Sequence, residues 1–428
     1  MYTAISLAKK KPLAFDVFVP STHQHISIPM KIKSGVLFIS YDGMMEPLGQ
    51  SQVLSYLKRL VEVRSIYLIS FEKPEDWVNV TERFRIAQNI ARAGIFWYPL
   101  RYHRRPSSLA TAWDIVCGIM LGLWLVVRHR ISIVHARSYV PSVMALALKS
   151  ITGVKYVFDM RGFWADERVD GKLWSRSGTL YRVAKGFERR FLLSADHVVS
   201  LTHAALHEMQ CFPYLQARMP PVSVIPTCAD LARFNALQRK SEGQSFVLGY
   251  VGSAGTWYLF DEVAVCFTHL LRLRADSRLL IVNRGEHAYI RERLAAAGVP
   301  EEAVELTTAT HSEVPSQIAR MDAGIFFIKP VFSKQASAPT KLAEFLGCGV
   351  PCLGNAGVGD MAEVLEGEQV GIALKYFDGA SMIAGLQRLL LMAAEPTTRY
   401  RCVLAAQKHF SLDEGVFRYQ TIYERLDG

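Results

Sequence analysis

Short apolar runs alternate with longer helical patterns along the chain from Gly35 onward. The runs are rich in β-branched and aromatic residues, which is typical of buried strands. One series predicts strands at 36–40, 66–70, 95–99, 133–136, 156–159, 197–201 and 222–226, and a second series predicts strands at 247–252, 278–283, 304–307, 323–328 and 350–354. Strands that alternate with helices form parallel sheets covered on both faces, so the pattern predicts an α/β fold with two Rossmann-like units.

A polar, helix-poor stretch at about 233–245 separates the two series and predicts a linker. At 428 residues the chain is also longer than one hydrophobic core usually serves. We therefore expect an N-terminal domain at 34–235, a C-terminal domain at 236–408 and a C-terminal helix at 409–428 that returns to the first domain. Ligands bind at the carboxyl ends of parallel strands, so the two sheets are expected to face each other across a cleft.

The first 33 residues precede the predicted domains. Lys9, Lys10 and Lys11 interrupt their apolar stretch, and no small-residue cleavage site follows a long apolar core, so the pattern is not that of a signal peptide. We expect residues 1–33 to form a flexible extension.

The charge balance narrows the choice of partners. Lys and Arg number 49 against 39 Asp and Glu, a formal net charge of +10, yet charged residues make up only 21% of the chain. This combination favours an anionic ligand or an anionic membrane surface, and the absence of a dense basic helix or arginine-rich tail argues against nucleic acid. The seven cysteines form no CxxC pair and are odd in number, which argues against a disulfide framework and favours a reducing cytoplasm.

Residues 109–127 form an apolar stretch long enough to span a membrane. Asp114 within it and positive charge at both ends argue against a membrane span. We expect instead a core helix between the third and fourth strands, buried on several sides and therefore apolar all round. Peripheral contact of this helix and of residues 101–106 with the inner membrane leaflet stays open as an alternative.

The clearest candidate chemistry lies at 339–360, where a predicted helix is followed by a short strand and a glycine-rich turn. Pro339 suits the first helical position, and Lys341 and Glu344 share one helix face. Free N–H groups and the positive end of the helix dipole attract a phosphate, while a carboxylate one turn further on accepts hydrogen bonds from a ribose. The alternative is an ordinary solvated Lys–Glu pair.

The order of several segments resembles a retaining GT-B glycosyltransferase of family 4 over residues 34–428, nearly the whole chain. The segments that carry the resemblance are 40–60, 224–234, 249–262, 339–360 and 410–426. It implies an acceptor domain, a nucleotide-sugar donor domain, and transfer of a sugar to a hydroxyl with its anomeric configuration kept. The implied enzyme is of the hexosyltransferase type, with a UDP- or GDP-sugar as co-substrate and a glycan or lipid-linked acceptor, in cell-surface polysaccharide or glycolipid synthesis. We expect no other cofactor, and no metal because no DxD-like pair ends a predicted strand.

The resemblance also assigns the donor site. Glu344 matches the second glutamate of the family's E-x7-E signature, which binds the ribose, whereas Ala336 stands where the first glutamate belongs. The family's arginine–lysine clamp on the diphosphate is also missing, and Lys341, Lys334 and Arg284 are the candidate replacements. The donor-binding residues that the resemblance implies are Gly49, Gln50, Gly252, Ser253, Arg284, His311, Val314, Lys334, Ser337 and Glu344.

The resemblance implies further roles for residues at helix starts, turns and strand ends. Lys341 and Thr340 would steady the leaving diphosphate, whose own oxygen takes the acceptor proton. Arg137 ends the fourth strand, about where relatives carry a second histidine near the reacting sugar. Gly49 would let the backbone approach the donor phosphates, with Gln50 beside it. The expected acceptor-binding residues are Asp42, Glu46, Arg161 and Asp166.

Two other function classes stay open. Gly249, Gly252 and Gly255 follow a strand, with Arg284 at the end of the next, which fits an NADP-dependent oxidoreductase; a GT-B sugar-nucleotide epimerase belongs to the same alternative. Asn283 stands where an NAD enzyme has an acidic residue. The missing carboxylate at Ala336 makes a non-catalytic GT-B relative, acting as a binding subunit, the second alternative.

Overall fold

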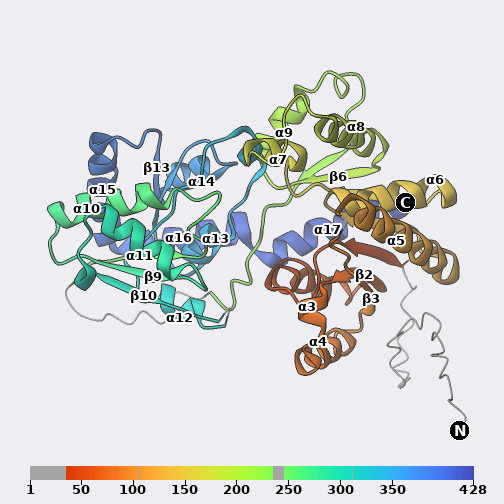
Figure 1. The fold of residues 1–428 in the computed structure, drawn as a ribbon, viewed down its shortest axis with the longest axis horizontal. Helices are drawn as coiled ribbons and strands as arrows, with labels where there is room; N and C mark the ends of the chain where they lie inside the picture. The colour runs from red at the N-terminus through yellow and green to blue at the C-terminus, as the bar shows by residue number, and fades with distance from the viewer. Residues whose placement is uncertain (1–34, 106, 235–244, 311) are drawn as a thin grey trace, which may run out of the picture.

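The computed structural model describes residues 35–105, 107–234, 245–310 and 312–428. The predicted extension at 1–33, most of the predicted linker and His311 lie outside these residues. The described chain folds into two α/β units, each built on a parallel sheet with helices on both faces (Figure 1). The predicted fold class is confirmed.

The first sheet has seven strands in the order β3-β2-β1-β4-β5-β6-β7. Its strands are β1 Val36–Ser40, β2 Ile66–Glu72, β3 Phe96–Arg101, β4 Ile133–Arg137, β5 Lys155–Asp159, β6 His197–Ser200 and β7 Val222–Val224. All are parallel, and Ser40 of β1 pairs in register with Arg137 of β4. The strand order reverses between β1 and β4, which makes that point the place where an open α/β sheet leaves room for a ligand.

The second sheet has six strands in the order β10-β9-β8-β11-β12-β13. Its strands are β8 Val247–Val251, β9 Arg278–Val282, β10 Val304–Thr307, β11 Ala323–Ile325, β12 Cys352–Asn355 and β13 Gly371–Leu374. Every predicted strand is present, but β11 is shorter than expected, and β13 was not predicted. Strand β13 has only four residues, and two of them, Gly371 and Ala373, are small, so the sequence gives no clear strand pattern there.

Helices and short turns connect the strands. In the first unit they are α1 Pro47–Gly49, η1 Gln50–Leu54, α2 Ser55–Leu60, α3 Pro74–Trp77, α4 Val80–Arg92, α5 Ser107–His129, α6 Tyr139–Thr152, α7 Trp164–Asp170, α8 Thr179–Ser194 and α9 His203–Gln210. In the second they are α10 Phe260–Leu273, α11 His287–Ala296, η2 Glu301–Ala303, α12 Val314–Ile318, η3 Phe332–Ala336, α13 Thr340–Gly347, α14 Met361–Gly367, α15 Gly379–Ala394 and α16 Pro396–Phe410.

The last helix, α17 Leu412–Asp427, packs against the first sheet and α2. Tyr419 and Tyr423 are buried there, and their hydroxyls reach polar groups on β5 and β4. Arg64, itself buried, pairs with Asp427 at 2.6 Å. The end of the chain therefore forms part of the first unit's core.

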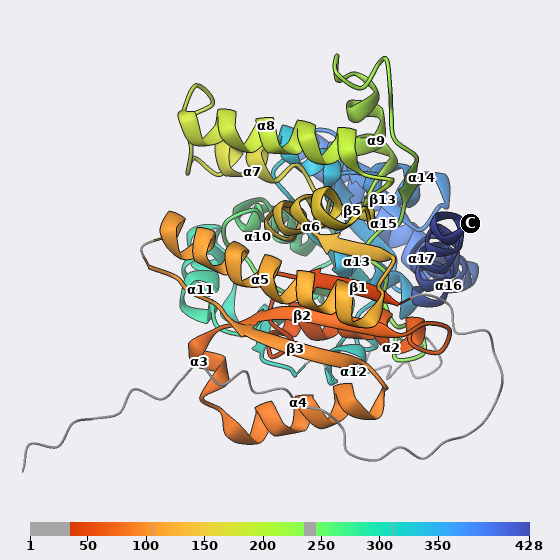
Figure 2. The ribbon, with the colours of Figure 1, turned by 90° about the vertical axis from the view of Figure 1, so that its right-hand side faces the viewer.

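Helix α5 differs from the sequence-based expectation. One face packs on α6 and on the first sheet (Figure 2), where Gly118 and Gly122 let Met144 and Leu148 of α6 approach closely. Asp114 is buried, where it accepts hydrogen bonds from the Tyr41 hydroxyl at 2.8 Å and the His103 N–H at 3.1 Å. The opposite face is exposed, so the expectation that this helix is buried on several sides is wrong.

The two units meet through η3 and the turn before α14. The Ser333 N–H donates to Asp170 at 2.8 Å, and the Lys334 ammonium pairs with Glu167 at 2.8 Å. Asp360 accepts from the first two N–H groups of α9, at 2.7 and 2.9 Å. A side chain of one unit thus caps a helix of the other.

Candidate active site

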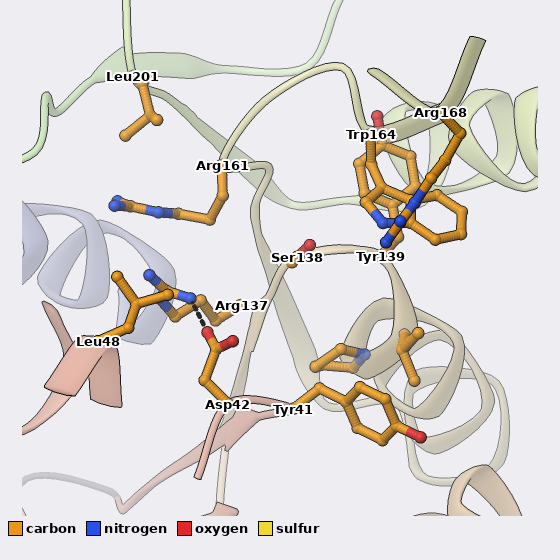
Figure 3. Close-up of a pocket in the computed structure, with 12 residues that line it drawn as sticks. Tyr41, Asp42, Leu48, Arg137, Ser138, Tyr139, Arg161, Trp164, Arg168 and Leu201 are labelled. Carbon is orange, nitrogen blue, oxygen red and sulfur yellow. Dashed lines mark hydrogen bonds and ion pairs between the residues drawn. The ribbon is translucent and has the colours of Figure 1, made fainter. Parts of the chain in front are cut away.

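A cavity of about 370 Å³ opens at the carboxyl edge of the first sheet, around the point where the strand order reverses (Figure 3). Residues just beyond β1, β4, β5 and β6 line it, together with the first turn of α6 and one face of α7. The lining residues are Tyr41, Asp42, Leu48, Arg137, Ser138, Tyr139, Val140, Pro141, Arg161, Trp164, Arg168 and Leu201. Three of the predicted residues, Asp42, Arg137 and Arg161, are among them.

Arg137 is almost fully buried at the end of β4 and forms an ion pair with Asp42 in the loop after β1. The pairing follows from the register of the two strands, which brings their carboxyl ends together. Burial lowers the pKa of Arg137, and the nearby Arg161 guanidinium lowers that pKa further. The Nε of Arg137 is buried without a hydrogen-bond acceptor. This donor is available to a ligand.

Arg161 lies in the turn after β5 with a positive φ of 56°, and only 12% of its side chain is exposed. Its guanidinium is 3.9 Å from Asp159, whose carboxylate also accepts a hydrogen bond from Tyr419 of α17 at 3.1 Å. Despite burial, Arg161 and His135 keep the pKa of Asp159 low. The C-terminal helix therefore helps to fix the charged floor of the cavity.

Two of the expected acceptor-binding residues are engaged elsewhere. Asp166 is buried and accepts hydrogen bonds from Tyr181 at 2.8 Å and Lys185 at 2.9 Å, so both carboxylate oxygens are used within the first unit. Glu46 pairs with Lys73 at 2.5 Å and accepts from the Gly43 N–H. Neither lines the cavity, and this arrangement does not support the predicted acceptor contact of Asp166.

Gly49 serves a purpose other than the predicted one. A Cβ atom at this position would lie 2.0 Å from the carbonyl oxygen of Gly43, so the glycine is needed for the loop to fold back on itself. The neighbouring Gln50 side chain donates to the Met45 carbonyl at 3.3 Å. The close approach at Gly49 is to its own chain, and the predicted approach to donor phosphates stays a prediction.

On the second unit, α13 begins at Thr340, and its N-cap residue Pro339 provides no side-chain cap. Lys341 in its first turn is only 7% exposed, and its ammonium has no hydrogen-bond acceptor. Aromatic rings surround it: the centroids of Tyr258, Tyr250 and Phe326 lie 3.7, 4.8 and 5.4 Å from its Nζ. Such rings attract a cation but do not neutralise it.

The electrostatics of this pair are unusual. Burial lowers the pKa of Lys341 to about 7, against the opposing effect of Glu344. Burial likewise raises the pKa of Glu344 to about 7, while Lys341 lowers it. The interpretation of these residues as an ordinary solvated pair is wrong, because Lys341 is only 7% exposed. A buried ammonium without a hydrogen-bond acceptor is a strong candidate for binding an anion.

The ammonium of Lys341 lies beside Gly252, which has φ of 98° at the end of β8, and a Cβ there would be 3.4 Å from Nζ. β8 and β11 are neighbours at the point where the second sheet reverses its order, and Phe326 directly follows β11. Lys341 therefore stands at the ligand-binding point of its own sheet.

The glycine-spaced loop after β8 does not behave as a dinucleotide site. The N–H groups of Ala254 and Gly255 both donate to Glu286, at 2.9 and 3.0 Å, and Asn283 holds the same carboxylate at 2.9 Å. The backbone donors that a dinucleotide phosphate needs are thus already used.

The other predicted donor residues are placed as follows. Arg284 is exposed after β9, Val314 begins α12, Ser337 follows η3, and Ser253 accepts a hydrogen bond from Tyr250 through its carbonyl. Lys334 is buried between Glu167 and the Trp257 ring, whose centroid is 3.9 Å from its Nζ, so its charge serves contact between the units. Its predicted role as a diphosphate contact is not supported by this arrangement.

Sequence reasoning missed Ser138 and Tyr139 as cavity residues. One signal was available: Ser138 follows a strand end, and Pro141 comes three residues later, a pattern that marks the start of a helix. No group of three or more His, Cys, Asp and Glu suited to a metal occurs among the described residues. Metal independence stays a prediction.

Comparisons with known proteins agree with the fold. Residues 57–228 match the family model described as a glycosyl transferase 4-like domain. A glycosyltransferase from Rickettsia africae superposes with TM-score 0.68 at 12% identity, covering 92% of this chain and 98% of that one. Sucrose-phosphate synthase from Thermosynechococcus elongatus gives TM-score 0.68 at 12% identity, with 92% and 99% covered. Anabaena HepE, in complex with UDP and glucose, superposes with TM-score 0.63 at 15% identity, covering 92% of this chain and 100% of that one. A comparison with curated protein sequences finds no match.

Proposed function

Because the chain is a glycosyltransferase with the GT-B fold and a glycosyl transferase 4-like domain, we propose that it is a retaining hexosyltransferase that uses a nucleotide-diphosphate sugar. The sugar passes to a hydroxyl of a glycan or lipid-linked acceptor. The observation that carries the proposal is the buried ammonium of Lys341 at the start of α13.

Lys341 supports a role in diphosphate departure. As the glycosidic bond to phosphate breaks, negative charge grows on the leaving group, and a fixed cation stabilises that charge without rearranging. The first N–H groups of α13, at Thr340 and Lys341, add the positive end of the helix dipole. Because the aromatic rings exclude water from the ammonium, its interaction with a phosphate is stronger than at a solvated site.

Glu344 lies one turn further along the same helix and is proposed to accept hydrogen bonds from the ribose hydroxyls. HepE has been crystallised with UDP-glucose, which favours UDP over GDP as the nucleotide here. A fold relative described as the lipopolysaccharide outer core galactosyltransferase WaaB, at 12% identity, supports an acceptor from cell-surface glycan synthesis.

The acceptor is proposed to bind in the cavity of the first unit, with its hydroxyl near Asp42 and Arg137. An ion pair with Arg137 already engages the Asp42 carboxylate. This pairing fits a reaction in which an oxygen of the departing diphosphate takes the acceptor proton. The reaction is proposed to need no metal.

We also propose that the protein works in the cytoplasm, on the inner face of the membrane, with α5 lying in the lipid interface. Large apolar side chains recur every three or four residues along its outer face, and each is at least half exposed. They are Leu109, Trp113, Val116, Met120, Trp124 and Val127. Exposed arginines flank the helix on both sides: Arg101, Arg104, Arg105, Arg128 and Arg130. An apolar stripe with tryptophans and basic flanks suits an anionic bilayer surface.

An assay of sugar transfer tests this proposed function. Purified protein is incubated with UDP- and GDP-sugars and membrane lipid extract, and nucleotide release and the anomeric configuration of the product are measured. We expect release of UDP and a product with retained configuration. Conversion of the donor to another sugar nucleotide without acceptor would instead support an epimerase, and inversion of the anomeric centre would contradict the retaining mechanism.

A further inference from the structure

The acceptor cavity of the first unit is positively charged (Figure 3). Arg137, Arg161 and Arg168 line it, against the single carboxylate of Asp42. Asp159, just beneath, also faces Arg161, so three guanidinium groups stand against two carboxylates. A sugar bound through neutral hydroxyls alone has no need of this excess of positive charge.

Two of the arginines are fixed by packing and still have N–H donors without an acceptor in the described part of the chain. Arg137 is paired with Asp42 through one nitrogen, and its buried Nε has no acceptor. Arg168 lies over the Trp164 ring, 5.3 Å from the centroid, and no ion pair to it occurs among the residues that the structure describes. Both side chains come from elements fixed by packing, β4 and α7, so a ligand meets donors that are already oriented.

The backbone contributes further donors at the same place. Ser138, with φ of 73°, turns the chain sharply from β4 into α6, and its side chain does not cap the helix. The N–H groups of Tyr139 and Val140 in the first turn of α6 have no intrahelical acceptor, and both residues line the cavity. A helix of 14 residues also directs the positive end of its dipole here.

We propose that the acceptor carries an anionic group, a phosphate or a carboxylate, which binds between Arg137, Arg168 and the start of α6. This inference rests on the proposed function, since it names the chemical class of the acceptor in that site. Trp164, whose ring forms one wall, packs against the sugar ring next to the anion.

The test uses the full chain and three probes: glucose 1-phosphate, glucuronate and uncharged methyl glucoside. Calorimetric titration measures each affinity at low and at high salt. We expect at least one anionic sugar to bind 10-fold or more tightly than methyl glucoside, with a preference that falls as salt rises. The phosphate and carboxylate arms identify which anion the cavity takes.

The variant Arg168→Gln should remove most of this preference, whereas Arg168→Lys should keep part of it. Arg182→Gln, an exposed arginine on α8 outside the cavity, is the matched control and should bind like the wild type. Equal affinity for all three probes, no measurable binding of either anion, or a preference that survives in Arg168→Gln would overturn the inference. UDP and GDP are titrated separately, because loss of donor binding would contradict the proposed function and not this inference.

Discussion

Replacing Lys341 by methionine separates stability from function. The ammonium is 7% exposed and has aromatic rings but no hydrogen-bond acceptor around it. A fall in pKa from 10.5 to about 7 corresponds to an unfavourable ~5 kcal/mol for holding the charged form in the fold at low pH. Methionine has a similar shape and packs well against aromatic rings. Methionine removes this unfavourable charge burial, but part of the resulting gain in stability is offset because the cation–π contacts are lost and Glu344 loses its neighbour.

We therefore expect Lys341→Met to raise the free energy of unfolding by about 1–3 kcal/mol at pH 7. The gain should depend on pH in a defined direction. The folded wild type binds fewer protons than the unfolded chain between about pH 7 and 10.5, so its stability rises with pH across that window. The advantage of the variant should thus shrink as pH increases above 7. Urea unfolding at several pH values measures it.

The same variant should bind UDP or GDP roughly 10- to 100-fold more weakly, since a charge-assisted bond to the diphosphate is lost. Lys375→Met, an exposed lysine in the same unit, is the matched control and should change neither property. Destabilisation of Lys341→Met with unchanged nucleotide affinity would refute the reasoning, because Lys341 would then be a structural residue.

Three further outcomes are expected. Glu344→Ala should weaken donor binding by about 1–3 kcal/mol, as measured by calorimetry, because the ribose hydroxyls lose their acceptor; unchanged affinity in a folded variant would exclude Glu344 from the site. Donor binding at pH 7 should take up about half a proton, because a diphosphate raises the pKa of Lys341 from about 7; titration in buffers of different ionisation enthalpy detects this, and zero uptake would contradict the assignment. Trp113→Glu together with Trp124→Glu should abolish co-sedimentation with vesicles containing phosphatidylserine, whereas Leu391→Glu on the second unit should not; retained binding would show that α5 is not the contact.

Most strands were predictable because their apolar runs are continuous and bounded by turn residues, as in Val36–Ser40. Helix α13 was predictable because Pro339 suits a helix start and Lys341 and Glu344 are spaced to share one helix face. Burial around them was not, since the rings of Tyr250, Tyr258 and Phe326 come from distant parts of the chain.

Side-chain partners and the surroundings of a helix face could not be predicted from the sequence. Asp166 is attractive in sequence because it lies past a strand end, but Lys185 and Tyr181 lie a further helix away and take its oxygens. The exposure of α5 was missed for a related reason: an apolar residue such as Leu109 has the same pattern whether its face meets protein or solvent.

The contact between Asp360 and α9 makes one short helix sensitive to whether the two units are in contact. The first two N–H groups of α9 donate to this carboxylate from the other unit, and the Thr202 hydroxyl donates to the Gln335 carbonyl at 2.6 Å. Separation of the units would break these three hydrogen bonds together, and the first turn of the eight-residue helix α9 would then fray more easily. Deuterium uptake at the amides of His203 and Ala204 would thus follow opening directly, without any probe attached to the protein.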